Sequence, residues 1–196
     1  MNYYKLGINP ASKKWKGYMN PSPFFLDDKG NELNDVKLSA IQERFNGVLY
    51  FDILSQGKIP PVTSTGSRFL AFNDSIFCTD DFDVNGVQPI PIINRDSNLK
   101  YILMHVFNYI DCVDWEHSKV DHWPVGYIPE TWQSKRGRFF IEPVIYKSKI
   151  PKNLDAFRLY EWNSAFNIVI SEKFKEKLLS VKFDHTFLDF KLVSLK

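Results

Sequence analysis

The sequence favours an α+β fold, in which a largely antiparallel sheet is covered by two or three helices within a single compact domain. The apolar runs are short and rich in aromatic and β-branched residues, which is typical of strands. Apolar residues recur at helical spacing in only two segments. Strands and helices also fail to alternate regularly, as they would around a parallel sheet. A length of 196 residues fits one domain, 1–196. The alternative is a division into an N-terminal half, 1–98, and a C-terminal half, 99–196, whose sequence motifs are clearer.

Eight strands are expected, each bounded by Gly, Pro, Asn or Asp. They are predicted at 48–54, 69–72, 87–93, 101–113, 138–146, 156–160, 166–170 and 186–193. In the last of these, Leu188, Phe190 and Leu192 fall on one face, while Asp189 and Lys191 fall on the other. A sheet with one apolar face has to be covered by another layer.

Two segments can form the covering helices. Residues 172–180 follow Ser171, a good N-cap, and place Phe174 and Leu178 on one face. Residues 35–45 follow Asn34 in the same way, and the Asn46–Gly47 pair is a stop signal. Both segments are therefore predicted to be amphipathic helices.

Composition and charge exclude several classes of protein. Aromatic residues make up 16% of the chain, which excludes a disordered polypeptide. The 25 basic and 23 acidic residues leave a net charge of +2, too small to drive nonspecific binding to nucleic acid or to a membrane. The first residues lack the apolar stretch of a signal peptide, and no segment is long enough to span a bilayer. With only two cysteines, Cys78 and Cys112, both expected to be buried in the core, the sequence predicts a cytoplasmic protein.

Segment 111–123 contains side chains that could bind a metal. Two histidines, His117 and His122, lie among four acidic residues, which are Asp111, Asp114, Glu116 and Asp121. The His-x4-His spacing is not that of a helical zinc site, and no cysteine pair completes it, so a polar loop is favoured and no metal is expected. The chain also lacks a nucleophile elbow, a P-loop and a dinucleotide fingerprint, so neither a catalytic group nor a cofactor is expected. A small enzyme or a metal- or ligand-binding domain using this segment stays open as an alternative.

Basic and aromatic side chains occur together at 132–140, where Trp132 is followed by Lys135, Arg136 and Arg138. Such a group could contact phosphates and stack on a base, which would make a nucleic-acid-binding module. A turn at Gly137 that leads into an edge strand would carry the same charges for solubility. Because the net charge is small, the turn is the favoured interpretation and no nucleic-acid partner is expected.

Two further groups could contact a protein. Trp123, Tyr127 and Trp132 lie in a segment rich in Pro and Gly, which indicates an ordered loop, and Trp and Tyr on such loops often anchor interfaces. Burial in the core is the competing interpretation. An acidic group formed by Asp80, Asp81 and Asp83 is either a solvated loop or a patch that attracts a basic partner.

The second half of the chain resembles the immunity-protein families of bacterial polymorphic toxin systems, some of which were first known as domains of unknown function. The resemblance is carried by four segments: KYILMHVFNYIDCVDWEHS (100–118), WPVGYIP (123–129), AFRLYEWNSAFNIVISEKFKEKLL (156–179) and FLDFKLV (187–193). Within them are a "hydrophobic-Asp-x-x-x-Ser" turn at 113–118, a "Phe-Arg-Leu" strand at 157–159, and a strand at 169–172 whose Ser and Glu open a helix. A Gly usual before the last strand is absent.

The resemblance implies a protein without enzymatic activity that binds and neutralises a cognate protein toxin by occluding its active surface. It implies a cytoplasmic protein with a protein partner and with no membrane or nucleic-acid partner. The contact residues expected on this basis are the loop aromatics Trp123, Tyr127 and Trp132 and the acidic group Asp80, Asp81 and Asp83.

Overall fold

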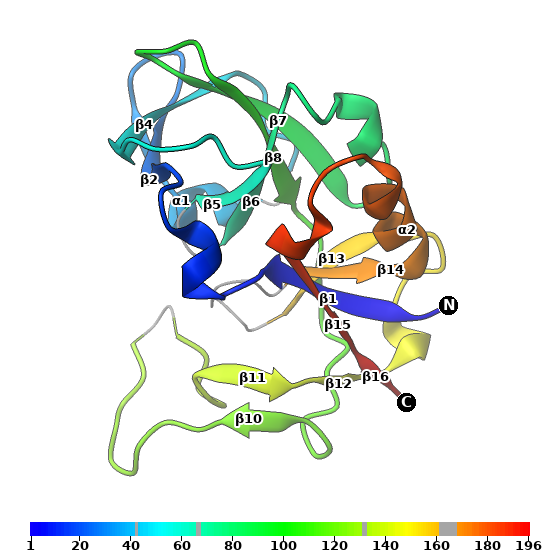
Figure 1. Ribbon diagram of the computed structural model, residues 1–196. Coiled ribbons are helices and arrows are strands. Elements are labelled where there is room, and N and C mark those ends of the chain that lie inside the picture. The colour runs from blue at the N-terminus through cyan, green and yellow to red at the C-terminus, as the bar shows by residue number, and fades with distance from the viewer. Residues whose placement is uncertain (42, 66–67, 131–132, 161–167) are drawn as a thin grey trace.

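Two β-sheets pack against each other in the computed structural model, which describes residues 1–41, 43–65, 68–130, 133–160 and 168–196 (Figure 1). The larger sheet has seven strands in the order β3-β2-β4-β7-β8-β6-β5, and the smaller has five in the order β15-β1-β14-β13-β9. The strands of the larger sheet are β2 (Asn20–Leu26), β3 (Glu32–Asn34), β4 (Leu49–Ser55), β5 (Val62–Thr65), β6 (Phe69–Asn73), β7 (Val87–Asn94) and β8 (Lys100–Val106). Those of the smaller sheet are β1 (Tyr3–Ile8), β9 (Tyr109–Ile110), β13 (Ala156–Leu159), β14 (Ile168–Ser171) and β15 (Leu188–Leu192).

Four short strands form two separate pairs. β10 (Lys119–Asp121) pairs with β11 (Phe139–Glu142), and β12 (Val144–Ile145) pairs with β16 (Ser194–Leu195). The helices described are α1 (Asp35–Ser39) and α2 (Glu172–Ser180), with four short 3-10 helices, η1 (Ser12–Trp15), η2 (Thr79–Phe82), η3 (Lys147–Lys149) and η4 (His185–Phe187). The fold is therefore mostly sheet with two helices, in agreement with the predicted α+β class.

The seven-stranded sheet curls until the regions near its two edges, at β2 and β5, meet. The main chain just before β2 bonds to the segment before β5: the N–H of Met19 donates to the carbonyl of Lys58 (2.9 Å), and the N–H of Lys58 donates to the carbonyl of Gly17 (2.7 Å). Gly57 lies at this seam, where a Cβ atom would come within 2.6 Å of the main chain at Tyr18. The absence of a side chain at Gly57 allows the two segments to approach.

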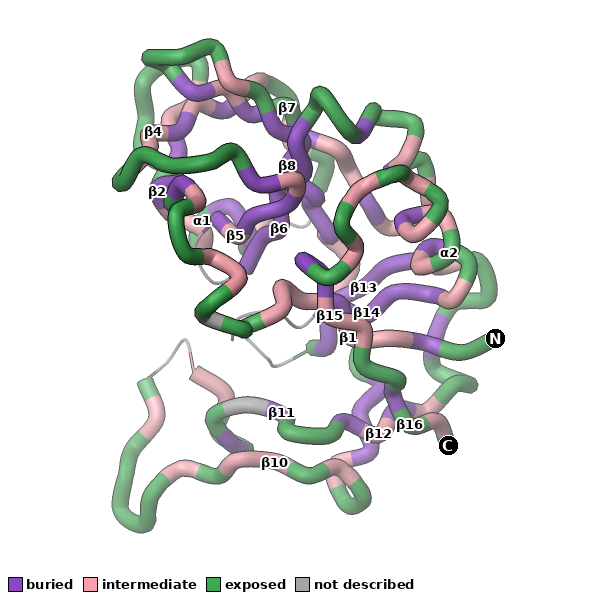
Figure 2. Tube along the Cα trace, in the orientation of Figure 1, coloured by how far each residue is buried: buried purple, intermediate pink, exposed green. Residues whose placement is uncertain are grey.

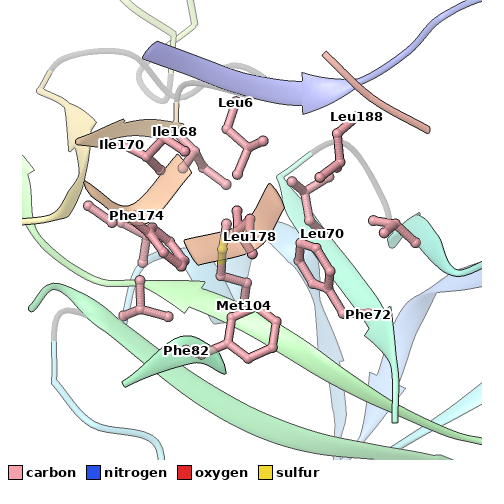
Figure 3. Packing of buried hydrophobic residues seen from close by; sticks show 14 of the residues in the cluster. Leu6, Leu70, Phe72, Phe82, Met104, Ile168, Ile170, Phe174, Leu178 and Leu188 are labelled. Atoms are coloured by element: carbon pink, nitrogen blue, oxygen red, sulfur yellow. The ribbon is translucent and has the colours of Figure 1, made fainter. Parts of the chain in front are cut away.

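The curled sheet has a buried cluster on each face. Its concave face encloses one cluster, and its convex face contributes to a second one. Inside it lies a cluster that includes Phe25, Phe51, Phe69, Tyr101 and Leu103. Outside it, strands of both sheets and α2 share a second cluster, whose labelled members in Figure 3 are Leu6, Leu70, Phe72, Phe82, Met104, Ile168, Ile170, Phe174, Leu178 and Leu188. Helix α2 therefore covers the junction between the two sheets.

The five-stranded sheet is buried on both faces. Alternate residues of β14 point to opposite sides, so Ile168 and Ile170 join the cluster shared with the large sheet, while Val169 joins a third cluster with Phe157 and Cys112. Strand pairs are parallel only for β4–β7, β9–β13 and β12–β16 among the described strands, and the sheets are largely antiparallel. Pairing of β7 with β8 and of β1 with β14 crosses position 98, so the two halves of the sequence are joined in both sheets.

The strand predicted at 101–113 is wrong in its length, because the chain crosses from one sheet to the other there. β8 ends at Val106 and pairs with β6 and β7, whereas β9 begins at Tyr109 and pairs with β13. The strand predicted at 138–146 is also divided. β11 and β12 lie on either side of Pro143, which has no N–H for a ladder, and they pair with different strands.

The last predicted strand begins too early. Residues 185–187 form η4, because the side chain of Asp184 accepts a hydrogen bond from the N–H of Thr186, and β15 starts at Leu188. The expected alternation also fails at the end of β15, where Leu192 is exposed and Val193 is buried. The strand predicted at 166–170 corresponds to β14, although residues 166 and 167 lie outside the described part of the chain.

The helix predicted at 172–180 is confirmed as α2, with Ser171 as its N-cap. The helix predicted at 35–45 ends at Ser39, although its cap Asn34 accepts from the N–H of Lys37 as expected. Near the end predicted for this helix, the amide of Gln88 on β7 bonds both the N–H (2.7 Å) and the carbonyl (2.5 Å) of Phe45 and so holds that residue outside a helix. Strands β1, β2, β3, β5, β10 and β16 were not predicted.

Candidate functional site

The most prominent feature outside the two sheets is the β10–β11 loop, residues 122–138, of which 131 and 132 are not described. Figure 1 shows β10 and β11 as a ribbon at the bottom of the molecule, with the loop at its outer end. Phe140 of β11 and Val120 of β10 pack in the buried cluster on one face of the five-stranded sheet. Exposed residues run along that outer end in Figure 2. Trp123 and Tyr127 lie in this loop, whereas Trp132 lies outside the described residues.

The tip of the loop is a tight turn. The N–H of Tyr127 donates to the carbonyl of Pro124 (3.0 Å), and Gly126 has a φ of +83°. A positive φ at the third residue is what a type II turn requires, and glycine adopts it without steric strain. Val125 therefore occupies the corner of the turn.

Side-chain contacts hold the two arms of the loop together behind this turn. The rings of Trp123 and Tyr127 stack at 4.6 Å between centroids, and the indole N–H of Trp123 donates to the carbonyl of Ser134 (2.7 Å). The side-chain oxygen of Gln133 accepts from the hydroxyl of Tyr127 (3.0 Å) and from the N–H of Glu130 (2.8 Å). These contacts, all between described residues of the loop itself, order it.

The tip exposes aliphatic side chains. Val125 is fully exposed, Ile128 is 85% exposed and Tyr127 is 44% exposed. No Asp, Glu, Lys or Arg occurs between Asp121 and Glu130. An ordered loop that holds apolar side chains in water is typical of a surface that contacts another molecule.

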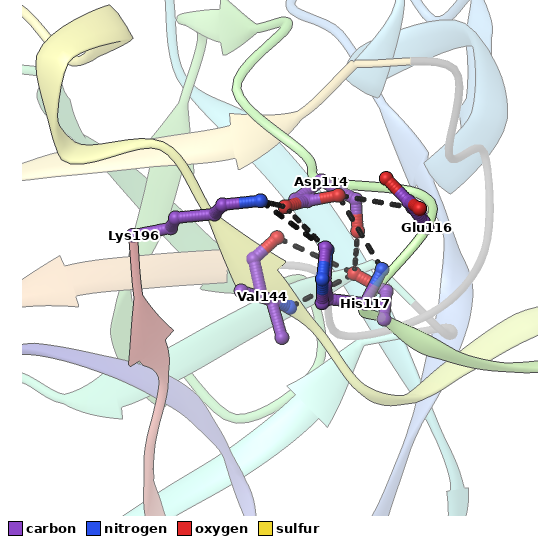
Figure 4. A network of polar contacts seen from close by, with 6 residues as sticks. Asp114, Glu116, His117, Val144 and Lys196 are labelled. Atoms are coloured by element: carbon purple, nitrogen blue, oxygen red, sulfur yellow. Dashed lines mark hydrogen bonds and ion pairs between the residues drawn. The ribbon is translucent and has the colours of Figure 1, made fainter.

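A network around Asp114 fixes the base of the ribbon (Figure 4). The Asp114 carboxylate is 2% exposed, and its Oδ2 lies 2.9 Å from Nδ1 of His117 and 3.0 Å from Nζ of Lys196. Its Oδ1 accepts from the main-chain N–H groups of Glu116 and His117. Although desolvation alone would raise the pKa of this carboxyl, hydrogen bonds from Lys196, His117 and Tyr146 hold it well below its usual range.

This network explains the "hydrophobic-Asp-x-x-x-Ser" turn in structural terms. The hydroxyl of Ser118 donates to the carbonyl of Asp114 (2.6 Å) and accepts from the N–H of Val144 (2.9 Å). The turn therefore ties the start of β10 to β12. The other two motifs also lie in the framework, since 157–159 is part of buried β13 and 169–172 joins β14 to α2.

The structure assembles only part of the metal-capable segment 111–123. Ligand atoms of Asp114, Glu116 and His117 lie within 4.8 Å of one another, and that group does not include His122, Asp111 or Asp121. The ammonium of Lys196 already lies against the buried carboxylate oxygen that a cation would use. The arrangement is that of a charged hydrogen-bond network that shapes a turn.

The basic residues of the loop have intramolecular partners. The guanidinium of Arg136 lies over the ring of Trp115, 4.8 Å from its centroid, and Nη1 of Arg138 is 3.4 Å from Oδ2 of Asp121. Lys135 is exposed. Of the three basic side chains that could contact phosphate, Arg136 and Arg138 therefore already bind residues of the ribbon or next to it.

The acidic group lies elsewhere. Asp80, Asp81 and Asp83 are on or just after η2, beside α2, at the opposite end of the molecule from the β10–β11 loop in Figure 1. The carboxylate of Asp81 accepts from the N–H of Cys78 (2.8 Å), and Lys177 of α2 donates to the carbonyls of Asp80 and Asp83. The structure does not bring this group together with the loop aromatics. Cys78 is exposed here, against the expectation of a buried thiol, while Cys112 is buried as expected.

Two of the cavities in the described part of the chain are lined by residues outside 111–123. One is an open groove of about 380 Å³ between the end of β1 and β5, with Trp15, Tyr18 and Thr63 among its lining residues and no charged side chain. The other, of about 280 Å³, is polar and includes Asp83, Asp155 and Lys173. Neither cavity brings together the groups of a recognisable catalytic site.

Val125, Ile128 and Gln133 are the residues that the sequence alone did not single out. The signal was present in the segment PVGYIP, because two prolines and a glycine within six residues exclude a regular strand and leave its aliphatic residues in a loop. No family model matches this sequence, and no curated protein is significantly similar to it. None of the helices in the described part of the chain is long and apolar enough to cross a membrane.

Proposed function

We propose that this chain is an immunity protein that binds a cognate bacterial toxin domain in the cytoplasm and neutralises it by covering its active surface. The observation that carries the proposal is the ordered β10–β11 loop, which holds Val125, Tyr127 and Ile128 in solvent. A protein that works by occlusion needs a rigid contact surface of about 600 to 1,000 Å² on its own side and needs no reactive group.

The contacts within the molecule support a binding role over the two alternatives. In the enzyme alternative His117 would act with His122, but His117 is bonded to Asp114 and lies in a network that shapes a turn. In the nucleic-acid alternative Arg136 and Arg138 would contact phosphates, but both have partners within the ribbon. The resemblance to immunity proteins agrees with the binding role and is carried by the quoted motifs alone.

Co-expression tests the proposal. The C-terminal domain encoded by the adjacent open reading frame would be induced in a bacterial host with and without this chain. We expect the domain alone to stop growth, the chain to restore it, and the two proteins to elute together in gel filtration. Failure of the chain to associate with that domain would contradict the proposal.

A paired variant separates the enzyme alternative. His117→Ala combined with His122→Ala removes both imidazoles from segment 111–123 and leaves the tip of the loop unchanged. We expect this variant to keep its affinity for the toxin domain within about threefold, because Lys196 and the main-chain N–H groups of residues 116 and 117 still bond the Asp114 carboxylate and the tip of the loop is not altered. If the variant still binds the toxin domain but no longer restores growth, catalysis by segment 111–123 is favoured.

A further inference from the structure

We propose that the β10–β11 loop binds as a finger, with Val125 and Ile128 entering a concave, apolar and uncharged pocket on the partner protein. This inference rests on the proposed function and names the contact and the chemistry of the partner's site. It differs from the expectation based on sequence, in which the aromatic residues and the acidic group make the contact.

The composition of the tip defines the pocket as apolar and uncharged. Val125 and Ile128 expose almost all of their side chains to water, and burying them on binding is favourable. Because no Asp, Glu, Lys or Arg occurs between Asp121 and Glu130, the tip offers no partner for a buried charge. A charged pocket would therefore be desolvated without compensation, whereas an apolar one would not.

The shape of the tip defines the pocket as concave. Val125 is at the corner of a tight turn, and the turn lies in the loop that extends from the outer end of the β10–β11 ribbon (Figure 1). A flat partner surface would cover only the outermost part of such a projection. A pocket that surrounds the turn can cover Val125 and Ile128 together.

The loop is preorganised for insertion. The positive φ of Gly126, the stack of Trp123 on Tyr127 and the two bonds accepted by Gln133 already fix the loop in the unbound protein. Binding then orders few additional dihedral angles, which lowers its entropic cost. Trp123 is on this view a positioning residue, since its indole N–H is used within the loop.

The closing experiment measures affinity for the toxin domain encoded by the adjacent open reading frame. The test variant carries Val125→Asp and Ile128→Asp, and the matched control carries Leu54→Asp and Ile59→Asp, at aliphatic residues that are 63% and 53% exposed elsewhere. We expect the dissociation constant to rise at least about 100-fold for the test variant and less than about threefold for the control. The control is the midpoint temperature of thermal unfolding, and a midpoint equal to that of the wild type in both variants shows that they keep the fold.

A second pair of variants tests the turn. Gly126→Val places a β-branched residue at a φ of +83°, whereas Gly126→Asn places there a residue that tolerates positive φ. We expect Gly126→Val to weaken binding at least about tenfold more than Gly126→Asn does. Equal affinities for the two variants would contradict a preorganised turn.

The outcomes separate this inference from the proposed function. If the wild-type chain does not bind the toxin domain, the proposed function fails and the inference fails with it. If the wild-type chain binds and the test variant binds equally well, only the inference is wrong. Two further measurements on the free protein test other occupants: flotation with phosphatidylcholine–phosphatidylglycerol vesicles and self-association in sedimentation. If the wild-type chain floats or self-associates and the test variant does not, the tip contacts a membrane or a second copy, and the inference is wrong.

Discussion

At the scale of single residues, the buried His105 on β8 is enclosed by aromatic rings and by a cation. It is fully buried, and the rings of Phe69 and Phe107 lie 6.0 and 5.9 Å from its own ring between centroids. Burial, and secondly the charge of Arg158, lower the pKa of His105 to about 4. The imidazole is therefore neutral in the folded protein at pH values where a histidine in the unfolded chain already binds a proton.

This difference predicts how stability depends on pH. Because the pKa in the folded state lies below the unfolded value of about 6.5, the contribution of neutral His105 is complete above pH 6.5 and is lost as the pH falls toward 4. We expect the wild-type free energy of unfolding to fall by on the order of 3 kcal/mol from this group over that range. His105→Gln should remove this component, while His122→Gln, at an exposed position, should keep the wild-type profile. Urea titrations at pH 7, 5.5 and 4 measure it, and parallel profiles for wild type and His105→Gln would contradict it.

The residues of the loop also show what a sequence can and cannot reveal at this scale. Trp123 and Tyr127 were predicted to lie in an ordered loop because Pro and Gly surround them, and both do. The exposure of Val125 and Ile128 could not be predicted, since the sequence does not show which aliphatic residues of a loop the rest of the protein covers. The structure shows that the rest of the protein leaves these two side chains uncovered.

At the scale of elements, the seam of the curled sheet depends on a close approach at Gly57. The atoms that a Cβ would meet there belong to the main chain of residues 17–19, at 2.6 to 2.7 Å, so no side-chain rotation can relieve the contact. Gly57→Ala should therefore destabilise the protein by about 1 to 3 kcal/mol, the usual cost of overpacking. Gly7→Ala is the control, because its Cβ would meet nothing within 4 Å, and we expect it to change stability by less than about 1 kcal/mol. Midpoints of urea unfolding compare the two, and equal midpoints would show that the seam can open without cost.

The start of α2 predicts a second effect at this scale. The hydroxyl of Ser171 accepts from the N–H of Phe174 (3.2 Å) and donates to the buried carboxylate of Asp155 (2.9 Å). Ser171→Ala removes the cap and leaves that carboxylate short of a donor, so we expect a loss of about 1 to 3 kcal/mol in thermal or urea unfolding. Ser180→Ala, at an exposed serine of the last turn, should cost less than about 0.5 kcal/mol. A similar effect at both positions would argue against the cap.

The elements differ in how far the sequence predicts them, for physical reasons. α2 has a cap, an apolar face and charges suited to its dipole, so local signals agree and its bounds are correct. α1 is shorter than predicted, and a distant residue, Gln88, binds the main chain of Phe45 near the predicted end of the helix, which no local pattern reveals. β1 and β2 were missed because polar residues and prolines interrupt them, and they become strands only by pairing with distant partners such as β14 and β4.

At the scale of the whole molecule, the two sheets share one cluster of buried side chains. Leu6 and Ile170 of the small sheet, Phe72 and Met104 of the large sheet and Phe174 of α2 belong to it (Figure 3). Removing water from this common interface stabilises both sheets together. The small sheet is also assembled from both ends of the chain, since β1 pairs with β14 and β15, so neither half of the sequence contains all the strands of the five-stranded or the seven-stranded sheet.

This arrangement predicts that the protein unfolds as one cooperative unit. Phe174 is fully buried in the shared cluster, where its ring lies 6.5 Å from that of Phe82, and Phe174→Ala should lower the free energy of unfolding by about 3 to 5 kcal/mol. Because both sheets lose contacts at once, tryptophan fluorescence and far-ultraviolet circular dichroism should give the same urea midpoint in the wild type and a common, lower midpoint in the variant. Val36→Ala, at a residue of α1 that is 46% exposed, should move neither curve by more than about 0.5 kcal/mol. Two separate transitions in Phe174→Ala, one for each probe, would show that the sheets are independent units and that the shared cluster does not join them.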